Sequence, residues 1–189
     1  LEYLEETVKR VPDKIAFAND KTQLTFQQFS DDIRAIGSEL IRKGYQKEPV
    51  LIYMNKSPEA LEGFFGVIES GCFYVPLDEE MPKRRIELII ENTKARVIVC
   101  DQENLKRVKE LPFDGEIMLH EELAKKREDK EKLDKVRRTA LDTDPLYVLF
   151  TSGSTGMPKG VVGHHRGVID YIDQLSAVLD FDEESVFGN

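Results

Sequence analysis

The chain has 189 residues, 40% of them hydrophobic, and its 36 acidic side chains outnumber 27 basic ones to give a net charge of −9. This length supports one domain with a real core, and the acidic balance argues against nucleic acid as the main partner. With no signal peptide and no apolar run of membrane-spanning length, we expect a cytoplasmic protein without a membrane partner.

The first part of the chain predicts a helix, a hairpin and a second helix. Amphipathic spacing favours a short helix over residues 2–10, and two short runs at 15–18 and 23–25, joined by a polar turn, indicate a hairpin. Thr25 and Gln28 have the spacing of a capping box, so we expect a long amphipathic helix to begin directly after Thr25.

Apolar runs and amphipathic stretches then alternate. The long helix is predicted to end at Gly44, a buried strand follows at 50–54, and a helix with Pro58 at its first position ends before Gly71. The later predicted elements are strand 73–77, helix 83–93, strand 97–100, helix 103–111, strand 117–118, strand 146–150 and helix 166–179. This alternation is typical of an α/β fold, so we expect a layered, mostly parallel sheet flanked by helices.

Residues 121–138 are strongly charged, with eight basic and six acidic side chains. Such a segment is either a docking helix for a partner or a solvated surface helix or linker. The near-cancellation of the charges favours the second interpretation. We also expect His120 to lie on the surface, and the adjacent acids Asp31-Asp32 and Glu79-Glu80 to be solvated.

The two cysteines, Cys72 and Cys100, lie 28 positions apart with no histidine clustered beside them. This arrangement argues against a metal cage and against nucleophilic catalysis. We therefore expect two small buried hydrophobes and no metal-ligating residues.

The stretch with the clearest chemistry is segment 151–160, which directly follows the apolar strand at 146–150. Its three glycines allow close approach of the backbone to a ligand, its four hydroxyls can donate to phosphate oxygens, and Lys159 adds a mobile positive charge. Loops at strand ends are also where ligands bind in open α/β sheets. The segment therefore predicts polyphosphate binding. A structural Ser/Gly linker would explain neither Pro158-Lys159-Gly160 nor the preceding strand.

This segment differs from the Walker A loop of P-loop NTPases. That motif needs Gly-Lys-Ser/Thr leading into a helix, whereas here Pro158 separates glycine from lysine. Proline also pushes Met157 away from helical geometry, and Gly160 occupies the place of the magnesium-binding hydroxyl. The P-loop NTPase interpretation therefore fails.

Three segments, in order, resemble the adenylate-forming enzymes. Residues 147–161 resemble the phosphate-loop signature of that superfamily, and are most similar to the amino-acid adenylation domains of nonribosomal peptide synthetases and to D-alanine–carrier protein ligases. Residues 24–29 resemble the family's weak first motif, and residues 69–78 its second, whose usual form is Lys-Ala-Gly-x-Ala-Tyr-Val-Pro-Leu-Asp. His165 falls where the family often carries histidine.

The resemblance implies an ATP-dependent acid–thiol ligase. Such enzymes use ATP and Mg²⁺ to convert a carboxylate into an acyl-adenylate, and then pass the acyl group to a thiol, typically the phosphopantetheine of a carrier protein. Residues 73–78 are closer to the amino-acid branch than to fatty or aryl acid enzymes, so the implied substrate is an amino acid, with D-alanine a candidate.

The resemblance also implies roles for single residues. Lys159 would act in catalysis by offsetting charge on the leaving pyrophosphate, and His165 would lie at the wall of the active site. The residues implied to bind the ATP phosphates are Thr151, Ser152, Gly153, Ser154, Thr155, Gly156 and Lys159.

Only the first part of the family's large domain is covered by the resemblance. The later Phe-Asp, Tyr-Gly-x-Thr-Glu and Thr-Gly-Asp motifs do not occur, and neither does the C-terminal lid domain. We therefore expect residues 1–189 to form a partial N-terminal AMP-binding domain that is inactive alone and self-associates through its incomplete sheet. The alternative from a different class is a non-catalytic nucleotide-binding or interaction module that kept the loop but lost turnover.

Overall fold

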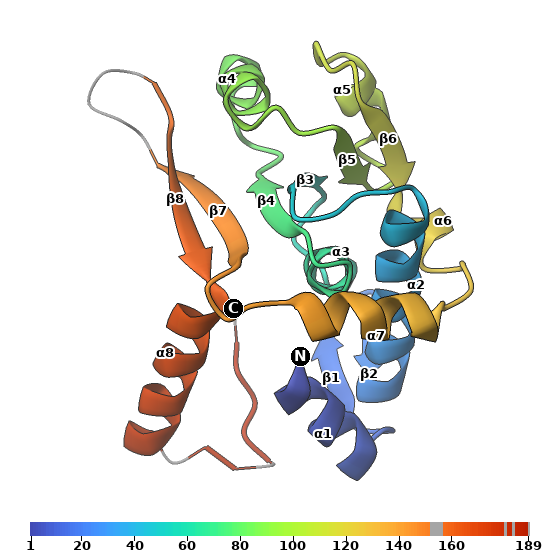
Figure 1. Ribbon diagram of the computed structural model, residues 1–189, viewed down its shortest axis with the longest axis vertical. Coiled ribbons are helices and arrows are strands. Elements are labelled where there is room, and N and C mark those ends of the chain that lie inside the picture. Colours follow the sequence, from blue (N-terminus) through green and yellow to red (C-terminus); the bar gives the residue numbers. More distant parts are fainter. Residues whose placement is uncertain (152–156, 180, 183, 189) are drawn as a thin grey trace.

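The computed structural model describes residues 1–151, 157–179, 181–182 and 184–188. In this part of the chain a six-stranded sheet and a two-stranded hairpin are accompanied by helices (Figure 1). The strands are β1 (Ile15–Ala18), β2 (Gln23–Thr25), β3 (Pro49–Tyr53), β4 (Phe73–Leu77), β5 (Val97–Cys100), β6 (Glu116–Leu119), β7 (Pro145–Thr151) and β8 (Lys159–His164). The helices are α1 (Glu2–Arg10), α2 (Phe26–Arg42), α3 (Pro58–Glu69), α4 (Lys83–Thr93), α5 (Leu105–Lys109), α6 (His120–Leu123), α7 (Lys130–Thr139) and α8 (His165–Val178).

The main sheet is mostly parallel, which confirms the predicted fold class. Its strand order is β6-β5-β3-β4-β7-β8. Neighbouring strands from β6 to β7 run parallel, whereas β8 runs antiparallel to β7 at the edge of the described sheet. Strands β1 and β2 form the predicted hairpin.

Alternation along β3 divides the core into two layers. Val50 and Ile52 pack in a cluster with side chains of α2, α3 and α6, whereas Leu51 and Tyr53 pack in a cluster with side chains of α4 and α5. Successive strand residues point to opposite faces, so a continuous apolar run is what a sheet covered on both faces requires.

Two predicted helix boundaries are confirmed by their capping contacts. The Gln28 N–H donates to Thr25 Oγ1 at 3.1 Å, and the Thr25 N–H donates to Gln28 Oε1 at 2.9 Å, which completes the capping box of α2. Ser57 Oγ accepts from the Ala60 N–H at 3.2 Å at the start of α3. Gly44, with a φ of +85°, follows the end of α2. Side-chain caps satisfy N–H groups that the first helical turn leaves unpaired.

Helices α2 and α3 cross closely because glycines lie at their contact. A Cβ atom added to Gly37 would meet Glu69 Cβ at 2.6 Å, and one added to Gly66 would meet Ile36 Cγ2 at 2.5 Å. Both distances are too short for real carbon atoms, so this approach of the two backbones requires glycine at these positions.

Strand β8 was not predicted from the sequence. The segment from Lys159 to His164 pairs with β7 along its length, with Val148 opposite Val162 and Thr151 opposite Lys159. Two of its six residues are glycines, which weaken an intrinsic strand signal. Its strand conformation depends on pairing with β7, which is a tertiary contact.

The predictions for His120 and Asp32 were wrong. His120 is only 3% exposed, and its Nε2 lies 2.8 Å from Oε2 of Glu62, which is 2% exposed. Asp31 is exposed as expected, but Asp32 is half-buried, and burial, followed by the negative charge of Glu62 and a hydrogen bond with it, raises the pKa of Asp32 to about 7. Both residues have charged neighbours in sequence, which favoured the prediction of solvent exposure, but in the structure they belong to a buried polar contact between helices.

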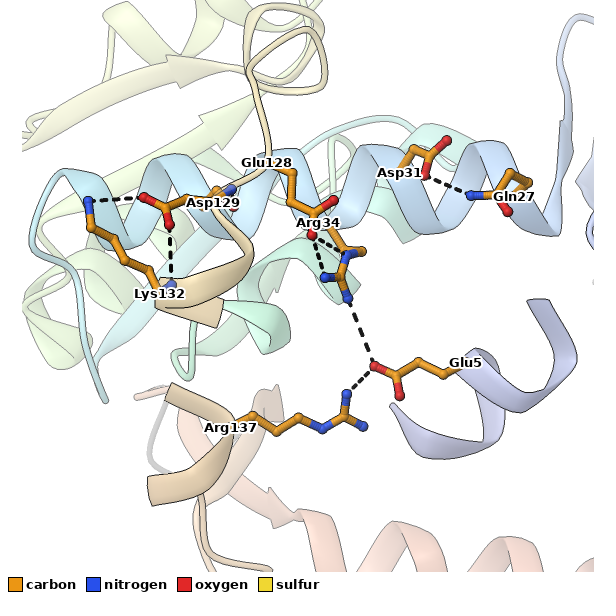
Figure 2. Close-up of polar contacts among 9 residues, drawn as sticks. Glu5, Gln27, Asp31, Arg34, Glu128, Asp129, Lys132 and Arg137 are labelled. Carbon is orange, nitrogen blue, oxygen red and sulfur yellow. Dashed lines mark hydrogen bonds and ion pairs between the residues drawn. The ribbon is translucent and has the colours of Figure 1, made fainter. Parts of the chain in front are cut away.

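Helix α7, from the charged segment 121–138, packs against α2 and α3 and is joined to α1 by the ion pair of Arg137 with Glu5. Figure 2 shows Glu5 between the guanidinium groups of Arg34 and Arg137, with Arg34 also contacting Glu128. Most of the segment's side chains are exposed, but Leu123 and Leu133 are 2% and 3% exposed and pack inward. The structure therefore agrees with a solvated surface helix, α7, that is anchored by Leu133.

Within the described residues, every helix is too short or too polar to span a lipid bilayer. Helix α5 is shorter than the predicted range 103–111.

Candidate functional site

The predicted phosphate-binding segment begins and ends on two paired strands. Thr151 is the last residue of β7 and Lys159 the first of β8, and the two are partners in the antiparallel register. Thr151 Oγ1 also donates to the Lys159 carbonyl oxygen at 3.4 Å. The structure therefore brings together the first and last residues of the predicted site. Ser152, Gly153, Ser154, Thr155 and Gly156 lie outside the described residues.

The hairpin is a second feature that distinguishes this segment from a P-loop. In a P-loop the segment leads from a strand into a helix, whose N-terminus helps to bind phosphate. Here the segment leads from β7 into β8, so the chain returns along the same sheet. Lys159 is exposed at the start of β8, and Pro158 before it is buried.

Glycines allow β8 to pack against the aromatic residues of β7. A Cβ atom on Gly163 would meet the Tyr147 ring at 2.4 Å, and one on Gly160 would meet Val148 Cγ1 at 2.9 Å and the Phe150 ring at 3.2 Å. The rings thus occupy the space that side chains at these positions would need. This packing fixes the backbone of β8, including that of Lys159, against β7.

Arg85 contacts the end of β7 from another part of the chain. Its Nη2 donates to the Phe150 carbonyl oxygen at 2.8 Å, one residue before Thr151. Arg85 is half-buried on α4, and its Nε atom is buried without a hydrogen-bond partner. Sequence reasoning missed this residue, because no motif links Arg85 to a strand that lies 65 positions away in sequence.

His165 lies at the other end of β8 from Lys159. The strand's six residues span about 16–20 Å, so the backbones of His165 and Lys159 are separated by about that length. His165 is half-buried, and its backbone N–H donates to the Asp144 carbonyl oxygen at 3.4 Å. Burial, reinforced by the positive N-terminal amino group and opposed by Asp144, lowers the pKa of His165. Its role at the active-site wall stays a prediction.

A shallow cavity of about 360 Å³ lies at this same end, between β7, β8 and α8. Its lining residues are Tyr147, Gly163, His164, Gly167, Val168 and Tyr171. Since Tyr147 and His164 lie toward the end of the hairpin that is remote from Thr151 and Lys159, the cavity is separate from the predicted phosphate site.

Metal ligation finds no support in the described residues, where no group of three or more His, Cys, Asp or Glu side chains could hold an ion. Cys72 and Cys100 are free and buried, as predicted. Burial, followed by the negative charges of Asp101 and Glu121, raises the pKa of Cys100 to about 12. Burial also raises the pKa of Cys72. Both thiols are therefore protonated at neutral pH and unsuited to ligate a metal.

Comparison with known proteins identifies a family over nearly the whole chain. The model of a family described as AMP-binding enzyme matches residues 4–187. One of the proteins that make up mycosubtilin synthase in Bacillus subtilis is 32% identical over 180 residues, which cover 95% of this chain and 7% of that protein. The chain thus spans less than a tenth of the length of this relative.

Solved structures share the fold. The crystal structure of VinN matches with a TM-score of 0.81 at 20% identity, over 97% of this chain and 50% of that chain. A nonribosomal peptide synthetase in its alpha-methyl-L-serine-AMP-bound form matches with a TM-score of 0.79 at 23% identity, over 93% of this chain and 19% of that chain.

Proposed function

This chain belongs to the AMP-binding enzyme family, and on that basis we propose that it forms part of an enzyme that activates an amino acid with ATP. In this proposal residues 1–189 are the first part of the N-terminal AMP-binding domain, and the remainder of that domain and the lid domain are absent from them. The match to only half of VinN and to 7% of the mycosubtilin synthase protein supports this division.

The proposed reaction has two steps. A carboxylate oxygen of the amino acid attacks the α-phosphorus of ATP, the bond to the bridging oxygen breaks, and pyrophosphate leaves. A thiolate then attacks the acyl carbon and AMP leaves, so that the aminoacyl group is carried as a thioester on the phosphopantetheine of a carrier protein. The similarity to mycosubtilin synthase supports an amino-acid substrate and a carrier-protein partner.

The observation that carries the proposal is the pairing of Thr151 with Lys159 across the β7–β8 hairpin. This pairing holds the backbones of Thr151 and Lys159, which carry the hydroxyl and the ammonium, beside each other. We propose that the hydroxyls and backbone N–H groups of residues 151–156 bind the β- and γ-phosphates, and that Lys159 offsets charge on the departing pyrophosphate.

Mg²⁺ supplies charge neutralisation on the phosphates when it is bound. It prefers oxygen ligands and usually keeps several waters and substrate phosphates in its shell. The hydroxyl-rich segment is compatible with that preference, whereas the two buried thiols are not. In our proposal Mg²⁺ therefore arrives with ATP, and this chain's oxygen donors near it are the hydroxyls of Thr151, Ser152, Ser154 and Thr155.

ATP–pyrophosphate exchange by the complete gene product tests the proposed function. L- and D-amino acids, including D-alanine, are compared with aryl and fatty acids. We expect exchange with an amino acid, and a loss of about 100- to 1,000-fold in Lys159→Ala, the range for removing a single electrostatic contact to the transition state. Lys21→Ala, in the exposed turn between β1 and β2, is the matched control and should leave exchange unchanged.

The second candidate is the non-catalytic nucleotide-binding or interaction module. This candidate would be favoured over the enzyme if the complete gene product is folded and binds ATP but shows no ATP–pyrophosphate exchange with any of the acids. We propose further that the 189-residue chain alone gives no exchange, and exchange by that chain would contradict the proposed division.

We also propose that this chain self-associates through β8. In the described sheet no strand pairs with the outer edge of β8, and Val161 and Val162 are 54% and 49% exposed on that strand. An unpaired apolar edge is a template for pairing with another strand, and a second copy supplies an identical one.

A further inference from the structure

The side chain of Arg85 joins α4 to the end of β7. Its Nη2 donates to the Phe150 carbonyl oxygen at 2.8 Å across 65 positions of sequence. Phe150 precedes Thr151, at which the predicted phosphate-binding segment begins. Figure 1 places α4 and the end of β7 on the same upper side of the molecule.

The position of Arg85 is fixed by the packing of its helix. Ile86, Ile89 and Ile90 of α4 are buried in the cluster that also contains Val148 of β7. Arg85 precedes Ile86 directly, so its backbone is held where the apolar side of the helix meets the sheet. A guanidinium is planar and presents its donors in a rigid fork, which makes it a stiff connection between these two elements.

The end of β7 receives different support on its two sides. On one side β8 pairs with it as far as Thr151. On the other side the register with β4 is defined at Tyr147 and Tyr74, three residues before Phe150. Arg85 therefore supplies a donor to the Phe150 carbonyl oxygen, beyond the position at which the register with β4 is defined and directly before the predicted segment begins.

The arginine is not explained by stability alone. It is half-buried, and its buried Nε–H makes no hydrogen bond in the described structure. An unsatisfied buried donor destabilises a fold. Its neighbour Arg84 differs, because it is exposed and pairs with Glu87 at 3.2 Å within α4. Two adjacent arginines thus have different surroundings, and only one reaches the strand.

We propose that Arg85 is a positioning residue for Thr151, the first residue of the predicted phosphate site, which it holds in place through the Phe150 carbonyl. The inference rests on the proposed function, because it assigns Arg85 to the site that would bind ATP. Binding of phosphate by backbone N–H groups requires those groups to be held in place beforehand, and a displacement of about 1 Å can reduce catalysis about 100-fold. Arg85 acts on the phosphates through the chain and does not contact the reacting atoms.

Kinetics of the complete gene product test the proposal. In ATP–pyrophosphate exchange, Arg85→Met should raise the KM for ATP about tenfold or more and leave the KM for the amino acid unchanged. Arg85→Lys, which keeps a donor and the charge, should recover part of this loss. Arg84→Met is the matched control and should change neither KM. An unchanged KM for ATP in Arg85→Met, or an equal rise in both KM values, would overturn the proposal.

Hydrogen–deuterium exchange of this 189-residue chain without nucleotide provides a readout that needs no activity. Arg85→Met should accelerate amide exchange in a peptide covering residues 146–151, and Arg84→Met should not. Unaltered exchange in Arg85→Met would refute the positioning role even if ATP–pyrophosphate exchange is active. If the wild-type complete product shows no ATP–pyrophosphate exchange, the proposed function is refuted. Faster amide exchange in Arg85→Met would in that case still support the structural role of the contact with Phe150.

Discussion

The Nε2 atom of His120 lies 2.8 Å from Oε2 of Glu62, and the two side chains are only 3% and 2% exposed. The contact lacks the alignment of a hydrogen bond, so charge attraction is what it contributes when the imidazole is protonated. Asp32 on α2 adds a second carboxyl group beside Glu62. Glu59 and Asp31 also interact electrostatically with members of this cluster. The helices α2, α3 and α6 thus share a buried polar contact.

Asp32→Asn should flatten the pH dependence of stability. The pKa of Asp32 is about 7 in the folded chain against an ordinary 3.8, so the folded state holds the proton more tightly and loses stability as pH rises from about 4 to about 7. At pH 8 we expect the variant to exceed wild type by about 1–2 kcal/mol, a figure reduced for solvent screening of the half-buried group, and to match it near pH 4. Urea denaturation over this pH range measures the effect. Exposed Asp31→Asn is the control, and parallel profiles for Asp32→Asn and wild type would contradict the prediction.

Removal of His120 should destabilise the fold through Glu62. His120→Gln leaves a carboxyl group buried without its partner, for which we expect a loss of about 3 kcal/mol in the free energy of unfolding. Glu62→Gln in the same chain should restore much of that loss, because it removes the unpaired charge. A double-mutant cycle by urea denaturation at pH 6 measures the coupling. Additive losses would mean that the two side chains do not interact.

The crossing of α2 and α3 should not tolerate even one added methyl group. Gly37→Ala and Gly66→Ala would place Cβ atoms 2.6 Å and 2.5 Å from carbon atoms of the facing helix. Each should lower the free energy of unfolding by about 1–3 kcal/mol, the usual cost of overpacking. Gly167→Ala on α8 is the matched control, since its nearest atom would be 3.9 Å away. Thermal unfolding should give lower melting temperatures for Gly37→Ala and Gly66→Ala than for Gly167→Ala. Equal melting temperatures for the three variants would exclude close packing at the crossing.

The ion pairs of Glu5, which join α1 to α2 and to α7, should contribute little to stability and depend on salt. Glu5→Gln removes the contacts of Glu5 with Arg34 and Arg137, which lie near the surface. We expect a loss below about 1 kcal/mol at low ionic strength that disappears in 1 M NaCl, where the screening length falls to about 3 Å. Urea denaturation at the two salt concentrations measures it. A loss that persists in high salt would indicate a role in packing.

Self-association should depend on the outer edge of β8. Sedimentation velocity over a concentration series should detect dimers or larger species of the 189-residue chain. Val161→Lys places a charge on the unpaired strand and should shift the distribution to the monomer. Val178→Lys, on an α8 residue that is 80% exposed, is the control. A monodisperse wild-type monomer at all concentrations would contradict the proposal.

The sequence predicted the elements whose signal is local. The apolar runs of β3 and β5 and the capping box of Thr25 and Gln28 identify their elements without reference to the rest of the fold. It failed for β8, because strand formation there depends on β7, and for His120, because its buried partner lies on another helix. Arg85 was not predicted either, because its contact with Phe150 joins segments that are far apart in sequence. Contacts between distant segments decide these three cases, and local patterns do not contain them.

Within the candidate site, the sequence predicted a segment whose first and last residues lie on two neighbouring strands of the structure. Thr151 and Lys159 are paired as strand partners, although the sequence had suggested a strand followed by a loop and a helix. The residues between them, 152–156, stay a prediction for phosphate binding. Their glycines and hydroxyls carry the chemical signal, whereas the hairpin that presents them is a tertiary feature.

The register between Thr151 and Lys159 also restricts how the segment can evolve. Seven residues, 152–158, connect the two partners. A slip of β8 by a single position against β7 would turn its side chains to opposite faces. Either Val162 or His164 would then stand over the Tyr147 ring in place of Gly163, where a Cβ atom has no room. Insertions and deletions between the two strands are therefore restricted to those that leave the pairing of Tyr147 with Gly163 in place.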